Sequence, residues 1–374
     1  MEEIFVGFMN LGIKQIIMFL IGGILIYLAI EKDYEPMLLL PIGFSTILVN
    51  LPLSSVLEYE GAPGVLRILF DAGIATELFP VLIFVGVGAM IDFTPLFVNP
   101  SMIFFGAAAQ FGIFATIVLC ILLGIDDLKL AASIGIIGAA DGPTAIFVAS
   151  KFAREYLGPI TVAAYSYMSL VPLVQPPVIR ALTTKKERMI RMDYKDVKVS
   201  RTVKILFPIF ITIISGIMAP ISVPLVGLLM FGNLIRECGV LERLSKAAQN
   251  ELSNIVTILL GITIGSTMTA DAFLKTTTLL ILLAGLAAFI FDTAGGVIFV
   301  KILNLFRKNK INPMVGAAGI SAFPMSSRVI QRMATKEDPT NFILMQAVSA
   351  NVAGQLGSII AGGIILSLVP LLVG

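Results

Sequence analysis

The sequence predicts an all-α polytopic membrane protein with about ten or eleven transmembrane helices, because about that many stretches approach the roughly 20 apolar residues that a span needs. Of its 374 residues, 57% are hydrophobic and only 13% are charged, whereas soluble domains carry about 25% charged residues. A third observation is an acid within an apolar stretch, Asp141, beside Gly142 and Pro143. Together these features predict a membrane protein built partly from broken helices.

Several kinds of chemistry have no basis in this sequence. The chain has no histidine, so an imidazole proton relay or a histidine metal site is excluded. Its two cysteines, Cys120 and Cys238, stand alone, and it has neither a phosphate-binding Gly-Lys-Ser/Thr loop nor a Rossmann GxGxxG motif. We expect no ATP, NAD or nucleic-acid partner on this chain. The first ten residues also lack the pattern of a signal peptide.

Residues 1–76 are expected to form an N-terminal unit. Apolar stretches at about Gly12–Ile30 and Met37–Val56 predict two spans, separated by the charged residues 31–33. The segment Glu58–Glu77 is short and charged, which favours a surface or re-entrant helix.

Residues 77–180 are expected to form a first structural repeat. It begins with a short apolar piece, Leu78–Met90, which runs into a glycine-rich segment and Asp92 that suggest an unwound helix. A full span at Ser101–Leu123 follows, then a helix over residues 133–150 that is broken at 140–144. The last span, Gly158–Pro176, is expected to end at the prolines 176–177.

The break at 140–144 is the centre of the functional prediction. A carboxylate near the middle of the bilayer costs about 2.5–3.5 kcal/mol on insertion scales. Gly142 and Pro143 loosen the helix and leave backbone carbonyls in need of a partner. A broken helix with one acid at the break is how transporters commonly build a cation site. The alternative is that Asp141 only caps the second half-helix, with Pro143 in its first turn, and both roles are compatible.

Residues 181–204 form the longest polar stretch and are rich in Lys and Arg. The positive-inside rule places this basic loop in the cytoplasm. It is either a loop that sets the topology or a docking surface for a soluble partner. Residues 205–254 are expected to link the two halves through two apolar helices, interrupted by Pro220 and Pro224, and an interfacial helix over Arg236–Asn254.

Residues 255–374 are expected to form a second repeat. Apolar stretches lie at Ile255–Thr267 and Leu279–Phe306, followed by a basic turn at 307–310. The stretch Ile311–Ile330 has a predicted break at 316–322, then a polar turn at Gln331–Thr340. The final span, Phe342–Val373, has a predicted break near Asn351.

The two halves resemble each other weakly. VLIFVGVGAMIDFTPL (from Val81) is similar to VTILLGITIGSTMTADAFL (from Val256), and IIGAADGPTA (from Ile136) to MVGAAGISAF (from Met314). Two copies with an odd number of spans would be inverted in the membrane, so that both breaks meet at the midplane. Chance similarity between Ala- and Gly-rich helices is the rival interpretation.

If the breaks meet, the second half supplies oxygen atoms to Asp141 from Asn312, Ser321 and Asn351. One carboxylate with amide, hydroxyl and carbonyl oxygens suits a monovalent cation, Na⁺ first. Asn312 could instead cap a helix that begins at Pro313, and Ser321 could be a small packing residue. The hydroxyl-rich segment Gly265–Asp271 and its analogue Gly88–Asp92 are either part of an ion path or helix ends.

Two further side chains need partners in the bilayer. The Tyr167 phenol requires a hydrogen bond, which is structural or serves proton transfer near the carboxylate. Arg328 follows the second break and could clamp a carboxylate, pair with an acid or extend to the cytoplasmic surface.

Four motifs resemble those of a known family. They are GIIGAADGPTAIF around Asp141, PLVQPPVIRALTTKKER from Pro172, NPMVGAAGISAFPMSSRV from Asn312 and NVAGQLGS from Asn351. They are similar to motifs in the β subunits of sodium-pumping biotin-dependent decarboxylases, which act on oxaloacetate, methylmalonyl-CoA, glutaconyl-CoA or malonate. The resemblance covers nearly the whole chain.

The resemblance implies a multisubunit pump in the inner (plasma) membrane. A carboxyltransferase α subunit would move CO₂ onto biotin on a carrier, and a small γ or δ membrane subunit would complete the complex, with several copies of this chain in it. Carboxybiotin would then lose CO₂ in this subunit while a proton is consumed and Na⁺ is exported. We expect no biotin-carrier domain on this chain. Because the chain lacks an early insertion that some oxaloacetate members carry, an acyl-CoA substrate is favoured.

The resemblance also implies residue roles. The catalytic residues would be Asp141, Tyr167, Ser321 and Arg328, with Tyr167 as a proton carrier. Arg328, Asn312 and Gly316 would bind carboxybiotin, and Asp141, Asn312, Ser321 and Asn351 would bind Na⁺. Elementary electrostatics agrees, because desolvation favours neutral Asp141 until a cation binds, so that Na⁺ and a proton would exchange at this site.

The competing interpretation is a self-sufficient secondary transporter, either a Na⁺/H⁺ antiporter or a Na⁺-coupled carboxylate symporter. Broken helices and inverted repeats serve that function equally well. A non-catalytic scaffold would leave an acid in the bilayer without a purpose.

Overall fold

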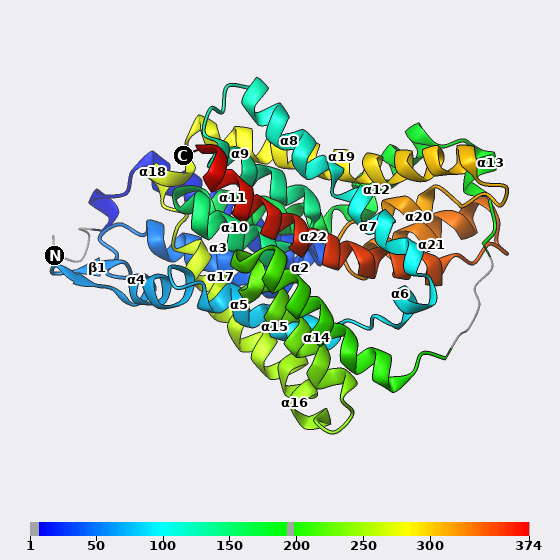
Figure 1. Cartoon of the computed structure of the whole chain (residues 1–374). Coiled ribbons are helices and arrows are strands. Elements are labelled where there is room, and N and C mark those ends of the chain that lie inside the picture. Colours follow the sequence, from blue (N-terminus) through cyan, green and yellow to red (C-terminus); the bar gives the residue numbers. More distant parts are fainter. Residues whose placement is uncertain (1–6, 193–197, 374) are drawn as a thin grey trace.

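The computed structural model describes residues 7–192 and 198–373. The first six residues and the middle of the predicted basic loop, 193–197, lie outside the described residues. Figure 1 shows a molecule made of helices that run mostly along one axis. The strands of the described residues are β1 (Glu58–Tyr59) and β2 (Ala62–Pro63), which form a small antiparallel hairpin.

The prediction of an all-α polytopic membrane protein is confirmed. Within the described residues, 4 helical segments are long and apolar enough to cross a membrane, or up to 6 if each of two bent pairs counts as one span. The long segments are Ile13–Lys32, Pro100–Leu122, Thr276–Phe306 and Leu344–Val373. Several of the ten or eleven predicted stretches form shorter or broken helices instead of full spans.

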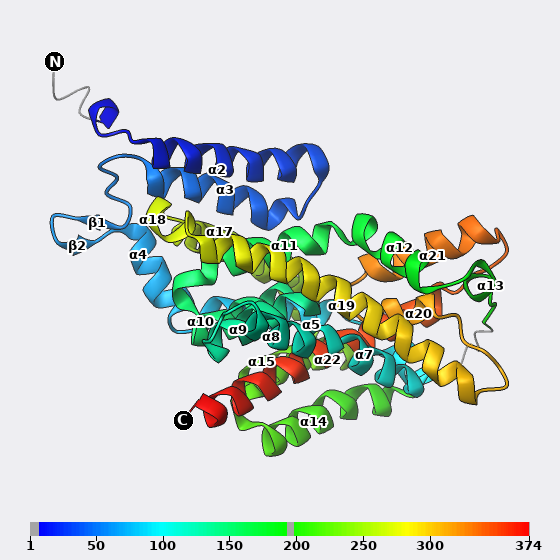
Figure 2. The same cartoon turned by 90° about the horizontal axis from the view of Figure 1, so that it is seen from above.

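The N-terminal unit is a helical hairpin of α2 (Ile13–Lys32) and α3 (Pro36–Asn50). Its helices approach closely where Gly22 faces Gly43, since a Cβ at either position would lie 2.7 Å from a carbonyl oxygen of the other. The hairpin lies along α17 (Ser253–Gly265) in Figure 2. The span predicted to reach Val56 ends at Asn50, whose side chain bonds Met268 O and Ala270 N at 2.8 and 2.7 Å.

The segment 58–77 is short, as predicted, and contains α4 (Val65–Leu69) and a π-helical turn, η1 (Phe70–Ile74). It is bent by 60° relative to α5 (Leu78–Met90). The predicted unwinding at Asp92 is confirmed: α5 ends at Met90, and Asp92 accepts a hydrogen bond from Thr94 N at 2.9 Å before α6 (Thr94–Val98) begins. The next span consists of η2 (Pro100–Met102), α7 (Ile103–Ala109) and α8 (Phe111–Leu122).

The predicted broken helix is present. It consists of α9 (Leu128–Gly135), the 3₁₀ turn η3 (Ile136–Ala139) and α10 (Gly142–Phe152). The break contains only Ala140 and Asp141, because Pro143 lies in the first turn of α10, where its missing N–H and fixed φ are tolerated.

The helix that follows does not end at the prolines as predicted. After η4 (Arg154–Tyr156) and α11 (Leu157–Ser169), the chain bends by 69° and continues as α12 (Val171–Leu182), straight through Pro176 and Pro177. The buried Gln175 side chain holds α12 in place: it donates to Ala317 O at 2.9 Å and accepts from Ser326 Oγ at 3.0 Å. Tertiary packing outweighs the local preference here.

The linking segment begins earlier than predicted. After α13 (Lys185–Arg188), α14 covers Arg201–Met218 and packs against α15 (Val223–Glu237). Pro220 lies between them in η5 (Pro220–Ser222), and Pro224 lies in the first turn of α15. The predicted interfacial helix is divided into α16 (Glu242–Ala247) and the π turn η6 (Ala248–Leu252).

The second half departs from its prediction in three places. After α18 (Ala270–Phe273) and the long α19 (Thr276–Phe306), the short α20 (Met314–Ala317) is followed by a break over 318–324, shifted from the predicted 316–322. The predicted turn Gln331–Thr340 is wrong, because α21 (Met325–Glu337) buries Ile330, Met333 and Ala334 on one face. The predicted break near Asn351 is also wrong, since α22 (Leu344–Val373) is continuous there.

The two breaks lie in contact with each other. The backbone N–H of Ser321, in the second break, donates to Ala139 O, at the edge of the first, at 3.0 Å. Gly354 of α22 packs so closely on Gly319 that an added Cβ would overlap its carbonyl. The relation of the two halves as inverted repeats, and the division of the chain at 77–180 and 255–374, stay predictions.

Candidate functional site

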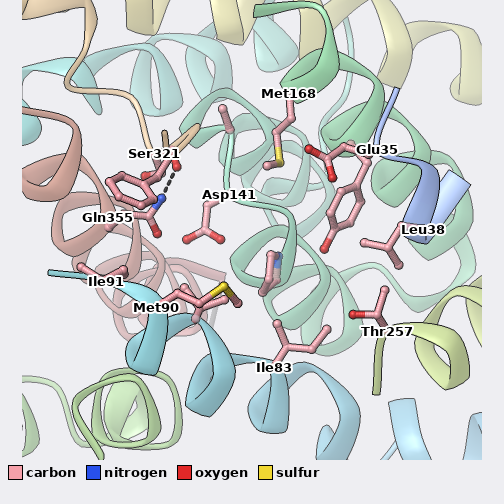
Figure 3. A pocket seen from close by; sticks show the side chains of 15 residues that line it. Glu35, Leu38, Ile83, Met90, Ile91, Asp141, Met168, Thr257, Ser321 and Gln355 are labelled. Carbon is pink, nitrogen blue, oxygen red and sulfur yellow. Dashed lines mark hydrogen bonds between the residues drawn. The ribbon is translucent and has the colours of Figure 1, made fainter. Parts of the chain in front are cut away.

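A cavity of about 250 Å³ lies where the two breaks meet. The first break contributes Ala140 and Asp141, the first turn of α10 contributes Pro143, and the second break contributes Ser321 and Phe323. Figure 3 shows Asp141 between Ser321 and Gln355 on one side and Glu35 on the other. The rest of the wall is mainly apolar, formed by residues such as Ile83, Met90 and Met168.

Asp141 is 6% exposed and occupies the N-cap position of α10. Its Oδ2 accepts hydrogen bonds from Thr144 Oγ1 at 2.6 Å and from Ser358 Oγ at 2.8 Å. The preceding Ala140 has a left-handed backbone with φ 53°, which costs a non-glycine residue about 1–3 kcal/mol. The surrounding structure therefore imposes this break, and it points the carboxylate into the cavity.

One polar stripe of α22 faces the breaks. It consists of Asn351, Gln355 and Ser358, spaced at i, i+4 and i+7, so they share one side of the helix. Asn351 Nδ2 donates to Ile320 O at 2.6 Å, and Gln355 Nε2 donates to Ser321 O. Asn351 Oδ1 is buried without a hydrogen-bond partner among the described residues, and Asn351 is not among the residues that line the cavity.

Ser321 is where the sequence placed it, in the second break. It is 1% exposed, lines the cavity and donates from Oγ to Gly354 O at 2.8 Å. The structure thus brings Asp141 and Ser321 into one cavity, with Asn351 one helical turn along α22 from Gln355.

The phenol that lines the cavity is Tyr165. Its ring packs directly on Gly142, where an added Cβ would overlap it. Tyr167, the predicted proton carrier, is not among the residues that line the cavity, and its hydroxyl donates to Leu282 O of α19. Sequence reasoning passed over Tyr165, although it precedes Tyr167 by only two positions.

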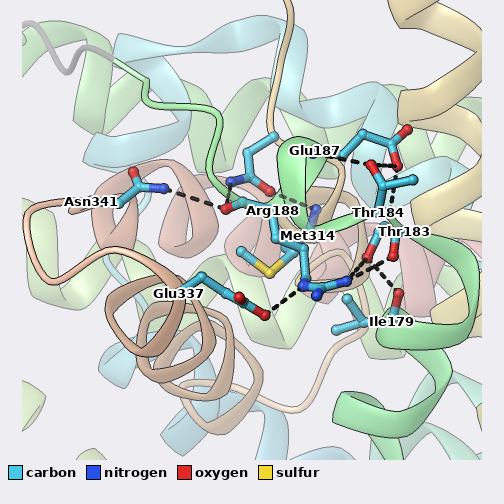
Figure 4. A network of polar contacts seen from close by, with 9 residues as sticks. Ile179, Thr183, Thr184, Glu187, Arg188, Met314, Glu337 and Asn341 are labelled. Atoms are coloured by element: carbon cyan, nitrogen blue, oxygen red, sulfur yellow. Dashed lines mark hydrogen bonds and ion pairs between the residues drawn. The ribbon is translucent and has the colours of Figure 1, made fainter.

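Asn312 lies in a different polar network. Figure 4 shows other members of that network, Arg188, Glu337 and Asn341. Asn312 Nδ2 donates to the carbonyls of Arg188 and Ile190 at 2.8 and 2.9 Å, and its Oδ1 accepts from Met314 N at 3.1 Å. Asn341 approaches the same two carbonyls at 3.4 and 3.3 Å. The structure therefore places Asn312 as an anchor for the basic loop, and not in the cavity with Asp141.

Ion pairs complete this network. Arg188 pairs with Glu337 at 2.7 Å, and Arg191 with Asp338 at 2.8 Å. Hydrogen bonds from Thr340 and Arg191 lower the pKa of Asp338 to about 2. Burial raises the pKa of Glu187, but hydrogen bonds from Thr184 and the nearby Lys301 outweigh it and lower this pKa overall. The network binds the described part of the basic loop to α21.

Gly316 and Arg328 also lie outside the cavity lining. Gly316 forms a close helix contact with Gly296 of α19, since a Cβ at either position would overlap the other's carbonyl. Arg328 is exposed on α21.

The hydroxyl-rich segment 265–271 forms local contacts. The hydroxyls of Ser266 and Thr267 donate to the carbonyls of Thr263 and Ile264, three residues earlier in each case. Asp271 forms an exposed ion pair with Lys14 at 2.7 Å.

Sequence reasoning missed a second buried acid, Asp292, in the middle of α19. It is fully buried, and its Oδ1 accepts from Ile113 N near the start of α8 at 3.1 Å. Its Oδ2 has no hydrogen-bond partner among the described residues and lies beside Gly138, where an added Cβ would be 2.6 Å away. A single acid in a long apolar stretch was the signal that could have found it.

These features define a class of protein: a polytopic membrane transport protein with two broken helices and one carboxylate at their meeting point. Helix ends, hydroxyls and amide oxygens surround this carboxylate, which is a suitable environment for a monovalent cation.

Comparison with known proteins identifies the family. Residues 14–369 match the family model described as the Na⁺-transporting oxaloacetate decarboxylase β subunit, so the chain belongs to this family. The methylmalonyl-CoA decarboxylase subunit β of Propionigenium modestum is 49% identical, with 97% of this chain and 96% of the relative aligned. The methylmalonyl-CoA decarboxylase subunit β of Veillonella parvula is 49% identical, with 97% of this chain and 95% of the relative aligned. Oxaloacetate decarboxylase β chain 2 of Salmonella typhi is 46% identical, with 97% of each chain aligned. The family resemblance expected from the motifs is confirmed.

Proposed function

We propose that this chain is the membrane subunit of a biotin-dependent decarboxylase, in which decarboxylation of carboxybiotin drives export of Na⁺. Carboxybiotin and one proton give biotin and CO₂: the C–N bond breaks, and the proton goes to the ureido nitrogen. The observation that carries the proposal is Asp141, a buried carboxylate at the contact between two helix breaks, in a chain of this family.

Asp141 would hold Na⁺ when ionised and a proton when Na⁺ leaves, because an isolated charge in a desolvated cavity is unfavourable. Ser321, Asn351 and the carbonyls of the second break are the proposed additional Na⁺ ligands. The free Oδ1 of Asn351 supports its inclusion. Thr144 and Ser358 would hold the carboxylate in position through Oδ2.

The roles of the remaining predicted residues follow from their positions. Tyr167 is proposed to deliver a proton, and Arg328, exposed on α21, to meet the carboxylate of carboxybiotin at the membrane surface. Asn312 and Gly316 would have structural roles near that surface. Asn312 is hydrogen-bonded to the basic loop, and Gly316 is packed against α19.

The direct test replaces the acid by its amide. Asp141→Asn in the whole complex should abolish both Na⁺ transport and carboxybiotin decarboxylation, because the amide cannot exchange a proton for a cation. A variant that kept Na⁺-stimulated turnover would refute the assignment of Asp141.

The partner proposal has its own test. A carboxyltransferase subunit, a biotin carrier and a small membrane subunit should co-purify with this chain, which we propose to be present in several copies. Avidin capture from mildly solubilised membranes should retain this chain with a biotinylated protein. If the chain is absent under gentle detergents but exchanges Na⁺ for protons alone in vesicles, it is an antiporter.

For the whole complex we propose an acyl-CoA substrate of the methylmalonyl-CoA type, in preference to oxaloacetate. The alignment to the Propionigenium relative spans 382 positions, against 420 for the Salmonella oxaloacetate chain, at the same 97% coverage of this sequence. This difference supports the absence here of an insertion that the oxaloacetate chain carries. Assays of the captured complex with methylmalonyl-CoA, glutaconyl-CoA and oxaloacetate would decide among them.

A further inference from the structure

A second carboxylate, Glu35, lines the Asp141 cavity. It comes from the turn between α2 and α3, outside both predicted repeats, and Figure 3 shows it on the opposite side of the cavity from Ser321 and Gln355. Leu38, one turn further along α3, lines the same cavity. The N-terminal hairpin therefore forms part of the site wall.

The backbone at Glu35 is held in an unusual conformation. Glu35 is the N-cap residue of α3 and has a left-handed backbone, with φ 38° and ψ 60°, directly before Pro36. A non-glycine residue adopts this region only where the surrounding structure requires it, and such residues are concentrated at functional sites. The conformation fixes the direction in which the Glu35 side chain leaves the turn.

The Glu35 carboxylate has no hydrogen bond or ion pair with any residue in 7–192 or 198–373, although it is only partly exposed. Glu35 and Asp141 line this cavity together with the phenol of Tyr165. Two carboxylates that share one largely apolar cavity repel each other and together attract a cation.

The position of Glu35 along the molecule indicates the direction of entry. Figure 2 shows that the α2–α3 turn points toward the end of the molecule that carries α13 and the basic loop. The positive-inside rule assigns that end to the cytoplasm, which is where an exported cation must enter.

We infer that Glu35 is a further cation-binding residue of this pump, which receives Na⁺ on the cytoplasmic side of the cavity before it passes to Asp141. This inference rests on the proposed function. It assigns to the N-terminal hairpin a direct contact with the transported ion.

The experiment measures decarboxylation by the whole complex as a function of Na⁺ concentration. Glu35→Gln should raise the KM for Na⁺ about tenfold, the effect of losing one nearby charge, while kcat at saturating Na⁺ stays within about twofold. Glu35→Asp should restore most of the affinity. The control is Glu31→Gln, since Glu31 is an exposed carboxylate beside the same turn and does not line the cavity.

The KM does not depend on how much of the variant folds, so reduced yield does not obscure the result. The difference in KM between wild type and Glu35→Gln should also shrink as ionic strength is raised with choline chloride. An unchanged KM, or an equal change in Glu31→Gln, would overturn the inference. If the wild-type complex itself shows no Na⁺ dependence, the proposed function fails instead.

Discussion

The hydroxyl of Ser358 offers the sharpest test of how the site holds its carboxylate. Ser358 Oγ donates to Asp141 Oδ2 at 2.8 Å, and Thr144 Oγ1 donates to the same oxygen at 2.6 Å. Both donors stabilise the ionised form, which is the form proposed to bind the cation. Ser358→Ala removes one donor and changes neither the charge nor the backbone of the site.

The expected magnitude follows from these two distances. A hydrogen bond to a charged group contributes about 1.5–3 kcal/mol, and O–H···O⁻ bonds of the strongest kind measure about 2.5–2.7 Å. The Ser358 bond is slightly longer, and Thr144 remains in place, so the lower value of about 1.5 kcal/mol applies. Since about 1.4 kcal/mol corresponds to a factor of ten, the KM for Na⁺ should rise about tenfold.

The assay is Na⁺-dependent decarboxylation by the purified complex, with the maximal rate and the KM determined separately. The matched control is Ser367→Ala on the same helix, because Ser367 donates only to the carbonyl of Gly363 one turn earlier. A Ser358→Ala complex with unchanged Na⁺ affinity and a reduced maximal rate would refute the reasoning, since it would show that the hydroxyl acts in the chemistry instead.

Three further predictions concern other parts of the molecule. Gly142→Ala should displace the Tyr165 ring, which packs on Gly142, and so slow decarboxylation in the same assay; full activity would show that the ring position is unimportant. Tyr167→Phe should slow decarboxylation more than it weakens Na⁺ binding if the phenol delivers a proton, whereas equal losses would mean that its bond to Leu282 O is structural. The pKa of Asp338 is lowered to about 2, so its contribution to stability is present above its unfolded pKa of about 3.9 and is lost as the pH falls toward 2. The difference in Tm between wild type and Asp338→Asn should therefore shrink as the pH is lowered from 5 to 3, and a constant difference would contradict this.

The sequence predicted the centre of the site well because its signals are local. Asp141, Gly142 and Pro143 each disfavour a continuous apolar helix, so the break could be placed to within three residues. The contact between the two breaks could be expected only from the weak internal similarity. The hydrogen bond from Ser321 N to Ala139 O supports the expectation that the breaks lie close together. The predicted turn at Gln331–Thr340 was wrong because polar composition was interpreted without its helical period.

The partners of Asp141 were not predictable in the same way. Ser358 and Gln355 stand more than 200 positions away from it, on a helix whose polar residues were interpreted as a break at Asn351. Their spacing of four and seven residues from Asn351 was the available signal for a continuous helix with one polar face. Asn312 illustrates the opposite error, since the motif around it is distinctive, but its amide is used to hold the basic loop.

The arrangement of these elements suggests where exchange of Na⁺ for a proton is transmitted. The first half of the broken helix packs on α19, because Gly138 lies against Asp292. Asp292 in turn accepts a hydrogen bond from the backbone of Ile113, near the start of α8. The second break is held to the first through Ser321, and α20, which precedes the second break, is held to α12 through Gln175. The contact of Asp141 with Ser358 is different, because in the proposed mechanism it is made by a side chain whose charge changes when the cation leaves. A change of charge on Asp141 would therefore alter two bonds at once, the bond to Thr144 within α10 and the bond to Ser358 on the continuous helix α22.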